Sequence, residues 1–230
     1  MVLLYFASAI ILSMGALFIK KQAVTKILVT IFLLIQIVFT IYVFQNSGKT
    51  ELIYFTFDAL GTIFLSVLTL VSIAVVYHGF MYFRDRSPER FYYYHSALIG
   101  LIAAITGAYF SNDVTAVWVL VEATTLTGSV LIYHKKTTTA LEATWKYIFL
   151  CSTGIAIAYL GILFLSMTMS GLGVQDLSFE SIRAAASGAN PLYLKIAFLF
   201  VLVGYSTKME LFPMHTVGID ANTEAPSPIA

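Results

Sequence analysis

The sequence predicts an all-α protein that crosses a membrane several times, and three observations lead to this fold class. Hydrophobic residues make up 59% of the 230 residues and charged residues only 11%, and the mean hydropathy is +0.87. These values are too apolar for a soluble domain of this length. The apolar residues gather in seven long runs, and the positive charge between the runs alternates from one connection to the next.

A membrane-spanning helix needs about 20 mostly apolar residues. The expected spans are residues 2–19, 27–44, 58–82, 92–110, 113–133, 145–167 and 192–217. The first run differs from a secretory signal peptide, because its lysines follow the apolar stretch instead of preceding it. We therefore expect a retained helix there.

The positive charges in the connections predict how the helices are oriented. Lysines and arginines gather after the first, third and fifth runs, whereas the other connections carry only Lys49 and Arg183. Because Lys and Arg are retained on the cytoplasmic side, these three connections are expected inside and the N-terminus outside. The residues concerned are Lys20, Lys21, Lys26, Arg84, Arg86, Arg90, Lys135 and Lys136.

The connection between the sixth and seventh runs, residues 176–191, predicts a short amphipathic helix that covers the outer surface. Ser178 suits its N-cap, and Gly188 and Pro191 suit its end. The chain has no evident internal repeat. It stops at Ala230 just where a further apolar segment is expected, so we expect a longer parent protein.

Several function classes are excluded by composition. A net charge of +1 provides no basic face for nucleic acid, and the single Cys151 rules out an intrachain disulfide or a thiolate metal cage. The sequence has no cysteine cluster, closely spaced histidine pair or glycine-rich phosphate loop. We expect no cofactor in this chain, so any electron transfer belongs to other subunits.

Two ionisable residues stand out within the apolar runs. Lys208 follows the apolar stretch from residue 192, and Glu122 lies in the middle of residues 114–133. A charge near the bilayer centre costs roughly 2.5 to 3.5 kcal/mol on insertion scales, so it is kept where it has a function or a partner. Burial disfavours a charged lysine and a nearby carboxylate favours it. The pair therefore predicts a proton path in which Glu122 acts on Lys208, directly or through water.

Each residue also has a structural interpretation. Lys208 is near the end of its run, so its ammonium can instead extend to the inner surface. Glu122 can be a carboxylate that is hydrogen-bonded to Thr125, Ser129 or a neighbouring helix. Glu210 is two residues from Lys208 and therefore points to another side of a continuous helix.

Pro213 predicts a break in the seventh helix, because proline lacks the backbone N–H and its ring clashes with the preceding turn. The break would free the carbonyl of Met209. Broken helices at membrane depth are tolerated where they face protein or water. We therefore expect Lys208, the Met209 carbonyl and His215 to line a hydrated cavity.

Asp58 begins the third run, where a helix cap is favoured over a functional carboxylate. Lys146 lies beside Trp145 and Tyr147, as an interfacial anchor does. It extends the proton path if the sixth helix begins earlier, and Glu142 is then its surface partner. The other histidines are expected at the membrane interface: His78, His95 and His134.

At these residues the sequence resembles the proton-translocating, antiporter-like subunits of respiratory complex I and of membrane-bound hydrogenases. Val121-Glu-Ala-Thr-Thr-Leu126 is similar to the glutamate-bearing fifth helix, and Glu142-Ala-Thr-Trp-Lys-Tyr-Ile148 to the start of the sixth. Thr207-Lys-Met-Glu-Leu-Phe-Pro-Met-His215 is similar to the broken seventh helix, and Phe57-Asp-Ala-Leu60 to the start of the third. The first two segments resemble most the F-subunit group of hydrogenase-4.

This resemblance implies a fold of about fourteen helices with two inverted repeats, each with a broken helix. Residues 1–91 would hold the first three helices, and residues 92–230 the first half-channel, incomplete at its C-terminus. One segment departs from the family, which usually has Trp-Leu-Pro-Asp-Ala-His where this chain has Val217-Gly-Ile-Asp-Ala-Asn222.

The sequence as a whole therefore predicts a membrane subunit of a redox-driven pump, in an energy-transducing membrane such as the cytoplasmic membrane of a prokaryote. Its expected partners are other membrane subunits, lipid and protons. Lys208 would carry the proton, Glu122 would act on it, and His215 and Lys146 would extend the path. Two alternatives are a sodium/proton antiporter subunit and a non-conducting scaffold, although a scaffold gains nothing from two buried charges.

Overall fold

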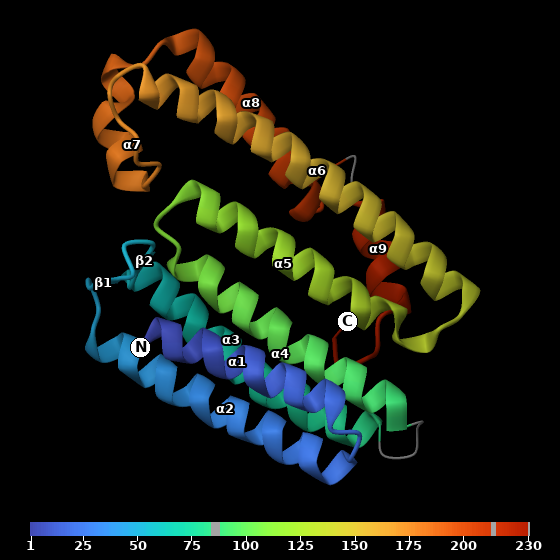
Figure 1. Ribbon diagram of the computed structural model, residues 1–230. Helices are drawn as coiled ribbons and strands as arrows, with labels where there is room; N and C mark the ends of the chain where they lie inside the picture. The colour runs from blue at the N-terminus through green and yellow to red at the C-terminus, as the bar shows by residue number, and fades with distance from the viewer. Residues whose placement is uncertain (84–87, 213–214, 230) are drawn as a thin grey trace.

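The computed structural model describes residues 1–83, 88–212 and 215–229, and this part of the chain is almost entirely helical (Figure 1). Six of its helices, α2 to α6 and α8, are long and apolar enough to cross a membrane, and α1 is a shorter apolar helix. The predicted polytopic all-α fold is therefore confirmed. The helices are α1 (Val2–Phe18), α2 (Gln22–Gln45), α3 (Ala59–Tyr82), α4 (Pro88–Phe110), α5 (Val114–Ile132), α6 (Thr138–Ser170), α7 (Phe179–Ala185), α8 (Pro191–Lys208) and α9 (Thr216–Glu224). The short elements are β1 (Thr50–Glu51), β2 (Phe55–Thr56) and the 3-10 turns η1 (Tyr133–Lys135) and η2 (Ala186–Gly188).

The sixth and seventh spans differ most from their expected limits. α6 begins at Thr138, seven residues before the expected start, because the Thr137 hydroxyl accepts a hydrogen bond from the Ala140 N–H at 3.1 Å. The seventh span, expected to continue to residue 217, ends at Lys208 and is followed by the separate helix α9. Pro213, the residue expected to break this helix, lies outside the described residues.

The end of α8 has its own local cause. Glu210 adopts a left-handed conformation with a φ of 52°. The N–H of Leu211 then donates to the Ser206 carbonyl at 3.1 Å, and that of Met209 to the Tyr205 carbonyl at 3.0 Å. The bond from Leu211 to Ser206 is the longer of the two bonds of a Schellman motif, which usually has glycine at the left-handed position. The helix therefore stops several residues before the proline.

Helices α1 to α4 form a bundle, α5 lies against α4, and α6 and α8 form a second layer on the other side of α5 (Figure 1). Aromatic and branched side chains fill the core of the first bundle, among them Phe32, Phe57, Leu65, Tyr94 and Ile99. α4 is the most buried of the spanning helices: 67% of its most apolar 18-residue stretch is buried inside the protein. It therefore supports α5 from the inside of the protein.

A polar network joins the four helices of this bundle. The side-chain amide of Gln36 is fully buried, and its nitrogen donates to the hydroxyls of Thr69 and Thr106 at 3.4 and 3.3 Å. The Tyr5 hydroxyl donates to the amide oxygen of the same glutamine. Hydrogen bonds between membrane helices contribute about 0.6 kcal/mol each. The network thus links α1, α2, α3 and α4 around one residue.

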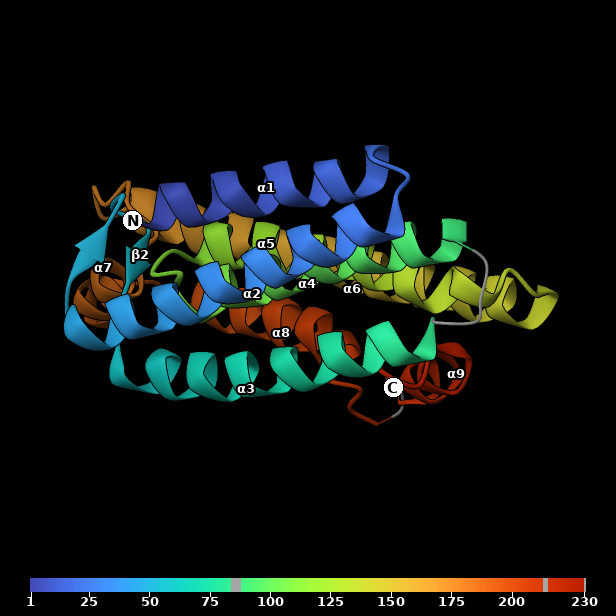
Figure 2. The same cartoon turned by 90° about the horizontal axis from the view of Figure 1, so that it is seen from below.

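The two ends of the molecule differ in composition. The α1–α2 and α5–α6 connections, which carry Lys20, Lys21, Lys135 and Lys136, lie at the end opposite the hairpin and α7 (Figure 2). Arg84 and Arg86 of the third basic connection lie outside the described residues. The described basic connections therefore share one end, as the charge pattern predicts.

Backbone hydrogen bonds close the opposite end. The N–H of Asn112 donates to the Tyr54 carbonyl at 2.6 Å, and the Asn112 carbonyl accepts from the Phe179 N–H at 3.0 Å. The backbone contacts hold the hairpin, α5 and α7 together.

Ser178 is the N-cap of α7, as its sequence predicts, and accepts from the Ser181 N–H at 3.3 Å. Asp58 is the N-cap of α3 and accepts from the Gly61 N–H at 3.1 Å.

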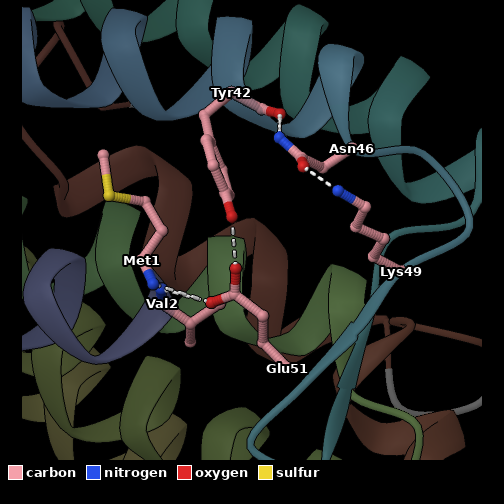
Figure 3. Close-up of polar contacts among 6 residues, drawn as sticks. All are labelled: Met1, Val2, Tyr42, Asn46, Lys49 and Glu51. Carbon is pink, nitrogen blue, oxygen red and sulfur yellow. Dashed lines mark hydrogen bonds and ion pairs between the residues drawn. The ribbon is translucent and has the colours of Figure 1, made fainter.

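Glu51 of β1 ties the start of the chain to the end of α2 (Figure 3). Its Oε2 accepts from the Met1 ammonium at 2.8 Å and from the Val2 N–H at 2.9 Å, and its Oε1 accepts from the Tyr42 hydroxyl at 2.6 Å. Partial burial acts to raise the pKa of this carboxyl, but the donors outweigh it and hold the pKa at about 2.

This arrangement predicts a pH-dependent contribution to stability. Because the folded pKa lies below the ordinary value of 4.5, the stabilisation is present above about pH 4.5 and is lost as the pH falls toward 2. Thermal unfolding of the detergent-solubilised protein should show a higher Tm for the wild type than for Glu51→Gln at pH 7. We expect this difference to shrink below about pH 4.5; a difference that stays constant down to pH 3 would contradict the assignment.

Candidate functional site

The site is built on an unusually close crossing of α6 and α8. A Cβ added at Gly204 would lie 2.5 Å from the Gly154 carbonyl oxygen and 2.5 Å from the Ala158 nitrogen. A Cβ at Gly161 would lie 2.7 Å from the Ala197 carbonyl oxygen. Small residues allow membrane helices to approach at this distance, where backbone packing holds them together. α6 and α8 therefore form one rigid pair.

Lys208 ends α8, and its ammonium turns toward α6. The Nζ donates to the Tyr147 hydroxyl at 2.9 Å and lies 5.0 Å from the centroid of the same ring. A cation over an aromatic face is attracted to the ring. Gly128 of α5 leaves space on the other side of the tyrosine, because a Cβ there would lie 3.1 Å from the hydroxyl. Tyr147 thus lies between α5 and Lys208.

Glu122 projects from the middle of α5 toward the same helix, α6. Its Oε1 accepts a hydrogen bond from the Ser152 hydroxyl at 2.9 Å. Its Oε2 is buried and has no hydrogen-bond partner within the described ranges. A buried oxygen without a partner is unfavourable, so the position suits a hydrogen-bond donor such as a bound water.

Tyr147 and Ser152, the partners of the two charged residues, both belong to α6. Among the described residues, the hydrogen-bond partner of each charge is a hydroxyl of this helix. Glu122 and Glu210 are both near enough to attract the Lys208 ammonium electrostatically.

Glu210 differs from its expected position. A continuous helix would point it away from Lys208, whereas α8 has already ended and Glu210 has a left-handed backbone. Its carboxylate lies against Gly218 of α9, where an added Cβ would overlap it. The glycine in the segment that departs from the family pattern thus makes room for this carboxylate.

Lys146 and His215 lie in other surroundings. The Lys146 ammonium pairs with Glu142 at 2.8 Å and with Asp220 at 3.0 Å, so it joins α6 to α9. His215 precedes α9, is exposed, and stacks on Phe212 with ring centroids 5.7 Å apart. These contacts join neither residue to Lys208 or Glu122.

The three remaining histidines differ in burial. His78 is exposed near the end of α3, as an interfacial residue is. His95 is fully buried inside the helix bundle, with its Nδ1 2.8 Å from the Phe91 carbonyl oxygen. The reason is that α4 begins at Pro88 and is the central helix of the bundle. His134 is buried, and its Nε2 lies 3.3 Å from the Tyr82 hydroxyl.

Tyr147 and Ser152 were not predicted from the sequence as partners of the two charges. Helical spacing could have indicated Tyr147 in part. This residue shares one face of a helix that begins at Thr138 with three small residues, Cys151, Gly154 and Ala158. A hydroxyl on a face of small residues indicates a close helix contact. With the helix start placed at residue 145, Tyr147 instead looked like an interfacial aromatic.

Comparison with known proteins adds family information. Residues 111–230 match the family described as NADH:quinone oxidoreductase/Mrp antiporter, TM. The chain is 30% identical over 186 residues to a hydrogenase-4 component F homolog of Methylacidiphilum infernorum, covering 77% of this chain and 39% of the relative. It is 27% identical to an NADH-quinone oxidoreductase subunit of Anoxybacillus flavithermus, with coverages of 80% and 37%.

The chain is also 25% identical to an Na(+)/H(+) antiporter subunit of Bacillus subtilis, over 69% of this chain and 31% of the relative. The chain thus spans less than two fifths of the length of these three relatives. Among solved structures, the archaeal membrane-bound sulfane sulfur reductase, a respiratory membrane complex, contains a similar fold. The TM-score is 0.87 at 22% identity, over 99% of this chain and 48% of the other.

The close crossing predicts that one methyl group disturbs the site. Gly204→Ala places its Cβ against the backbone of α6, which should lower the stability by about 1 to 3 kcal/mol. Gly171→Ala is the matched control, because its Cβ meets only ordinary contacts at 3.5 Å. Thermal unfolding in detergent should show a lower Tm for Gly204→Ala and little change for the control. Equal Tm values for the two variants would contradict the assignment of this crossing.

Proposed function

The chain belongs to the NADH:quinone oxidoreductase/Mrp antiporter transmembrane family, and from that premise we propose that it is a proton-translocating membrane subunit of a redox-driven respiratory complex. In this proposal residues 92–230 supply a half-channel and residues 1–91 supply the helices beside it. The observation that supports it most is that the Lys208 ammonium and the Glu122 carboxylate both bond to hydroxyls of α6, those of Tyr147 and Ser152.

Lys208 is the proton carrier in this mechanism. In its charged form the ammonium donates to the Tyr147 hydroxyl at 2.9 Å. When it releases one proton to water, the neutral amine gains a lone pair and can accept from the same hydroxyl. Tyr147 therefore offers a hydrogen bond to both protonation states, and the lysine keeps its position throughout the transfer.

Glu122 is the carboxylate that acts on Lys208. Ser152 holds one of its oxygens, and the other oxygen is where a water or a proton would bind. When the carboxylate accepts one proton, it becomes neutral and no longer favours the charged lysine. Each transfer moves one proton and changes the charge of one donor and one acceptor. Glu210 is a second carboxylate that favours the charged state of Lys208.

The proposed setting is the cytoplasmic membrane of a prokaryote, with the N-terminus outside and the basic connections inside. The shared end of the described basic connections supports this orientation. Relatives named as parts of a hydrogenase and a quinone oxidoreductase support other membrane subunits as partners. Electron transfer and its cofactors would then belong to those partners.

Sodium/proton exchange is the second candidate function. The observation that favours it is the relative named as an Na(+)/H(+) antiporter subunit. Both functions use the same helices and buried charges, so the coupling ion is decided by experiment. A non-conducting scaffold is the outcome in which neither ion depends on Lys208.

The main prediction concerns the two buried charges. The full-length protein is reconstituted with its parent complex in sealed liposomes, electron transfer is started, and acidification of the lumen is followed with and without sodium. Lys208→Met and Glu122→Gln should each reduce pumping at least tenfold, because the proton loses a carrier or the carrier loses its counter-charge.

Lys195→Met is the matched control, since it makes the same change on an exposed residue of the same helix. It should pump as the wild type does. If Lys208→Met assembles and pumps normally, the scaffold interpretation replaces the proton path. If sodium movement is lost instead of proton movement, the antiporter function is supported.

Tyr147→Phe tests the hydroxyl alone, because the ring beneath the ammonium is kept. A hydrogen bond to a charged group contributes about 1.5 to 3 kcal/mol, so we expect pumping to slow by about tenfold or more. The pH dependence of pumping should move to lower pH, because the hydroxyl bonds more strongly to the ammonium than to the neutral amine and its loss disfavours the charged form. Tyr159→Phe on the same helix is the control. An unchanged rate and pH profile in Tyr147→Phe would contradict the role of this hydroxyl.

A further inference from the structure

A pocket of about 280 Å³ opens at the basic end of the molecule, between the first turns of α4 and the α5–α6 connection. Arg90 and Lys136 line it from these two sides, together with Tyr93 and Tyr133. It is separate from the Lys208 site, and none of its residues takes part in the proposed proton path. We propose that this pocket binds the phosphate headgroup of an anionic phospholipid.

The charge of the pocket points to an anion. Two basic side chains line it, and no carboxylate is among its described lining residues. The pocket lined by Glu142, Asp220 and Glu224 contrasts with it, because its described lining includes three carboxylates. Arg and Lys are the side chains that bind phosphate oxygens most strongly.

The backbone conformation and a ring contact fix the position of Lys136. Its backbone is left-handed, with a φ of 53°, at the end of η1. Its ammonium lies 5.8 Å from the centroid of the Tyr93 ring. The cation–π contact leaves the N–H groups of the ammonium available to a ligand, while it keeps the charge beside the pocket. The lysine is thus held in place before a ligand arrives.

The apolar part of the pocket distinguishes a lipid from a free anion. Val130 and Tyr93 line it and are 44% and 49% exposed, so they offer an apolar surface beside the two cations. A diacyl phospholipid matches both parts, with its phosphate on Arg90 and Lys136 and an acyl chain on Val130. Basic pockets between membrane helices on the cytoplasmic side are known to suit such headgroups.

This inference rests on the proposed function only for the membrane side. In that orientation the pocket faces the cytoplasmic leaflet, where anionic lipids are concentrated. A bound lipid would join α4 to the α5–α6 connection. The ion pair between Lys135 and Glu224, at 3.6 Å, joins the same connection to α9. A lipid bound in the pocket would therefore also stabilise the position of α9.

The test measures lipid binding directly and requires no pumping, so a failure of the proton path leaves its result unaffected. The full-length protein in detergent is titrated with phosphatidylglycerol, phosphatidylcholine or inorganic phosphate, and retained lipid and Tm are recorded. The wild type should retain phosphatidylglycerol at least tenfold more tightly than phosphatidylcholine. Arg90→Gln/Lys136→Gln should lose at least tenfold in apparent affinity for phosphatidylglycerol.

The matched control is Lys20→Gln/Lys21→Gln, which removes two charges from the same end but outside the pocket. It should bind as the wild type does. The single exposed variant Lys136→Gln, with an unchanged Tm without lipid, should still weaken binding about threefold. Equal affinities for the pocket and control variants would overturn the proposal. Displacement of the lipid by an equal concentration of inorganic phosphate would also overturn it, by assigning the site to a free anion.

Discussion

The contact between the backbones of α6 and α8 is the constraint on which the rest of the site depends. Gly204 has no Cβ, and its place in the crossing leaves no room for one. The two helices therefore lie close enough for Lys208 to reach Tyr147. The same helix α6 turns Ser152 toward Glu122 on α5. One helix therefore supports the partners of both buried charges, and a change in its distance from α8 alters only one of the two contacts directly.

The first four helices provide a rigid surface for this arrangement. Gln36 satisfies its amide within the bundle, and α4 is covered on most sides, so α5 rests on a helix with little freedom to move. The ends of the molecule are held in different ways. The hairpin, α5 and α7 are joined by backbone hydrogen bonds. α9 is joined by the exposed ion pair of Lys146 with Asp220 and by the buried apolar contact of Ala221 with Ile132 and Ala143.

Several interpretations of the sequence depended on where each helix begins and ends, and local hydrogen bonds at the helix ends determine those positions. The spans, the shared end of the described basic connections and the caps at Ser178 and Asp58 follow from the sequence, and the structure contains them. The start of α6 at Thr138 and the end of α8 at Lys208 were set by local hydrogen bonds at Thr137 and by the left-handed Glu210. With these limits, Lys146 is a partner of α9, and Glu210 comes within electrostatic reach of Lys208.

The sequence by itself determined that the chain crosses a membrane and that Glu122 and Lys208 are its unusual charges, because hydropathy and charge are local properties of each segment. The tertiary structure decided which hydroxyls those charges meet, why His95 is buried, and which basic residues share a pocket. The physical reason is that spanning helices are apolar around their whole circumference. Such a helix has no polar face to indicate its neighbour, so its orientation is set by the small residues and glycines that allow another helix to approach.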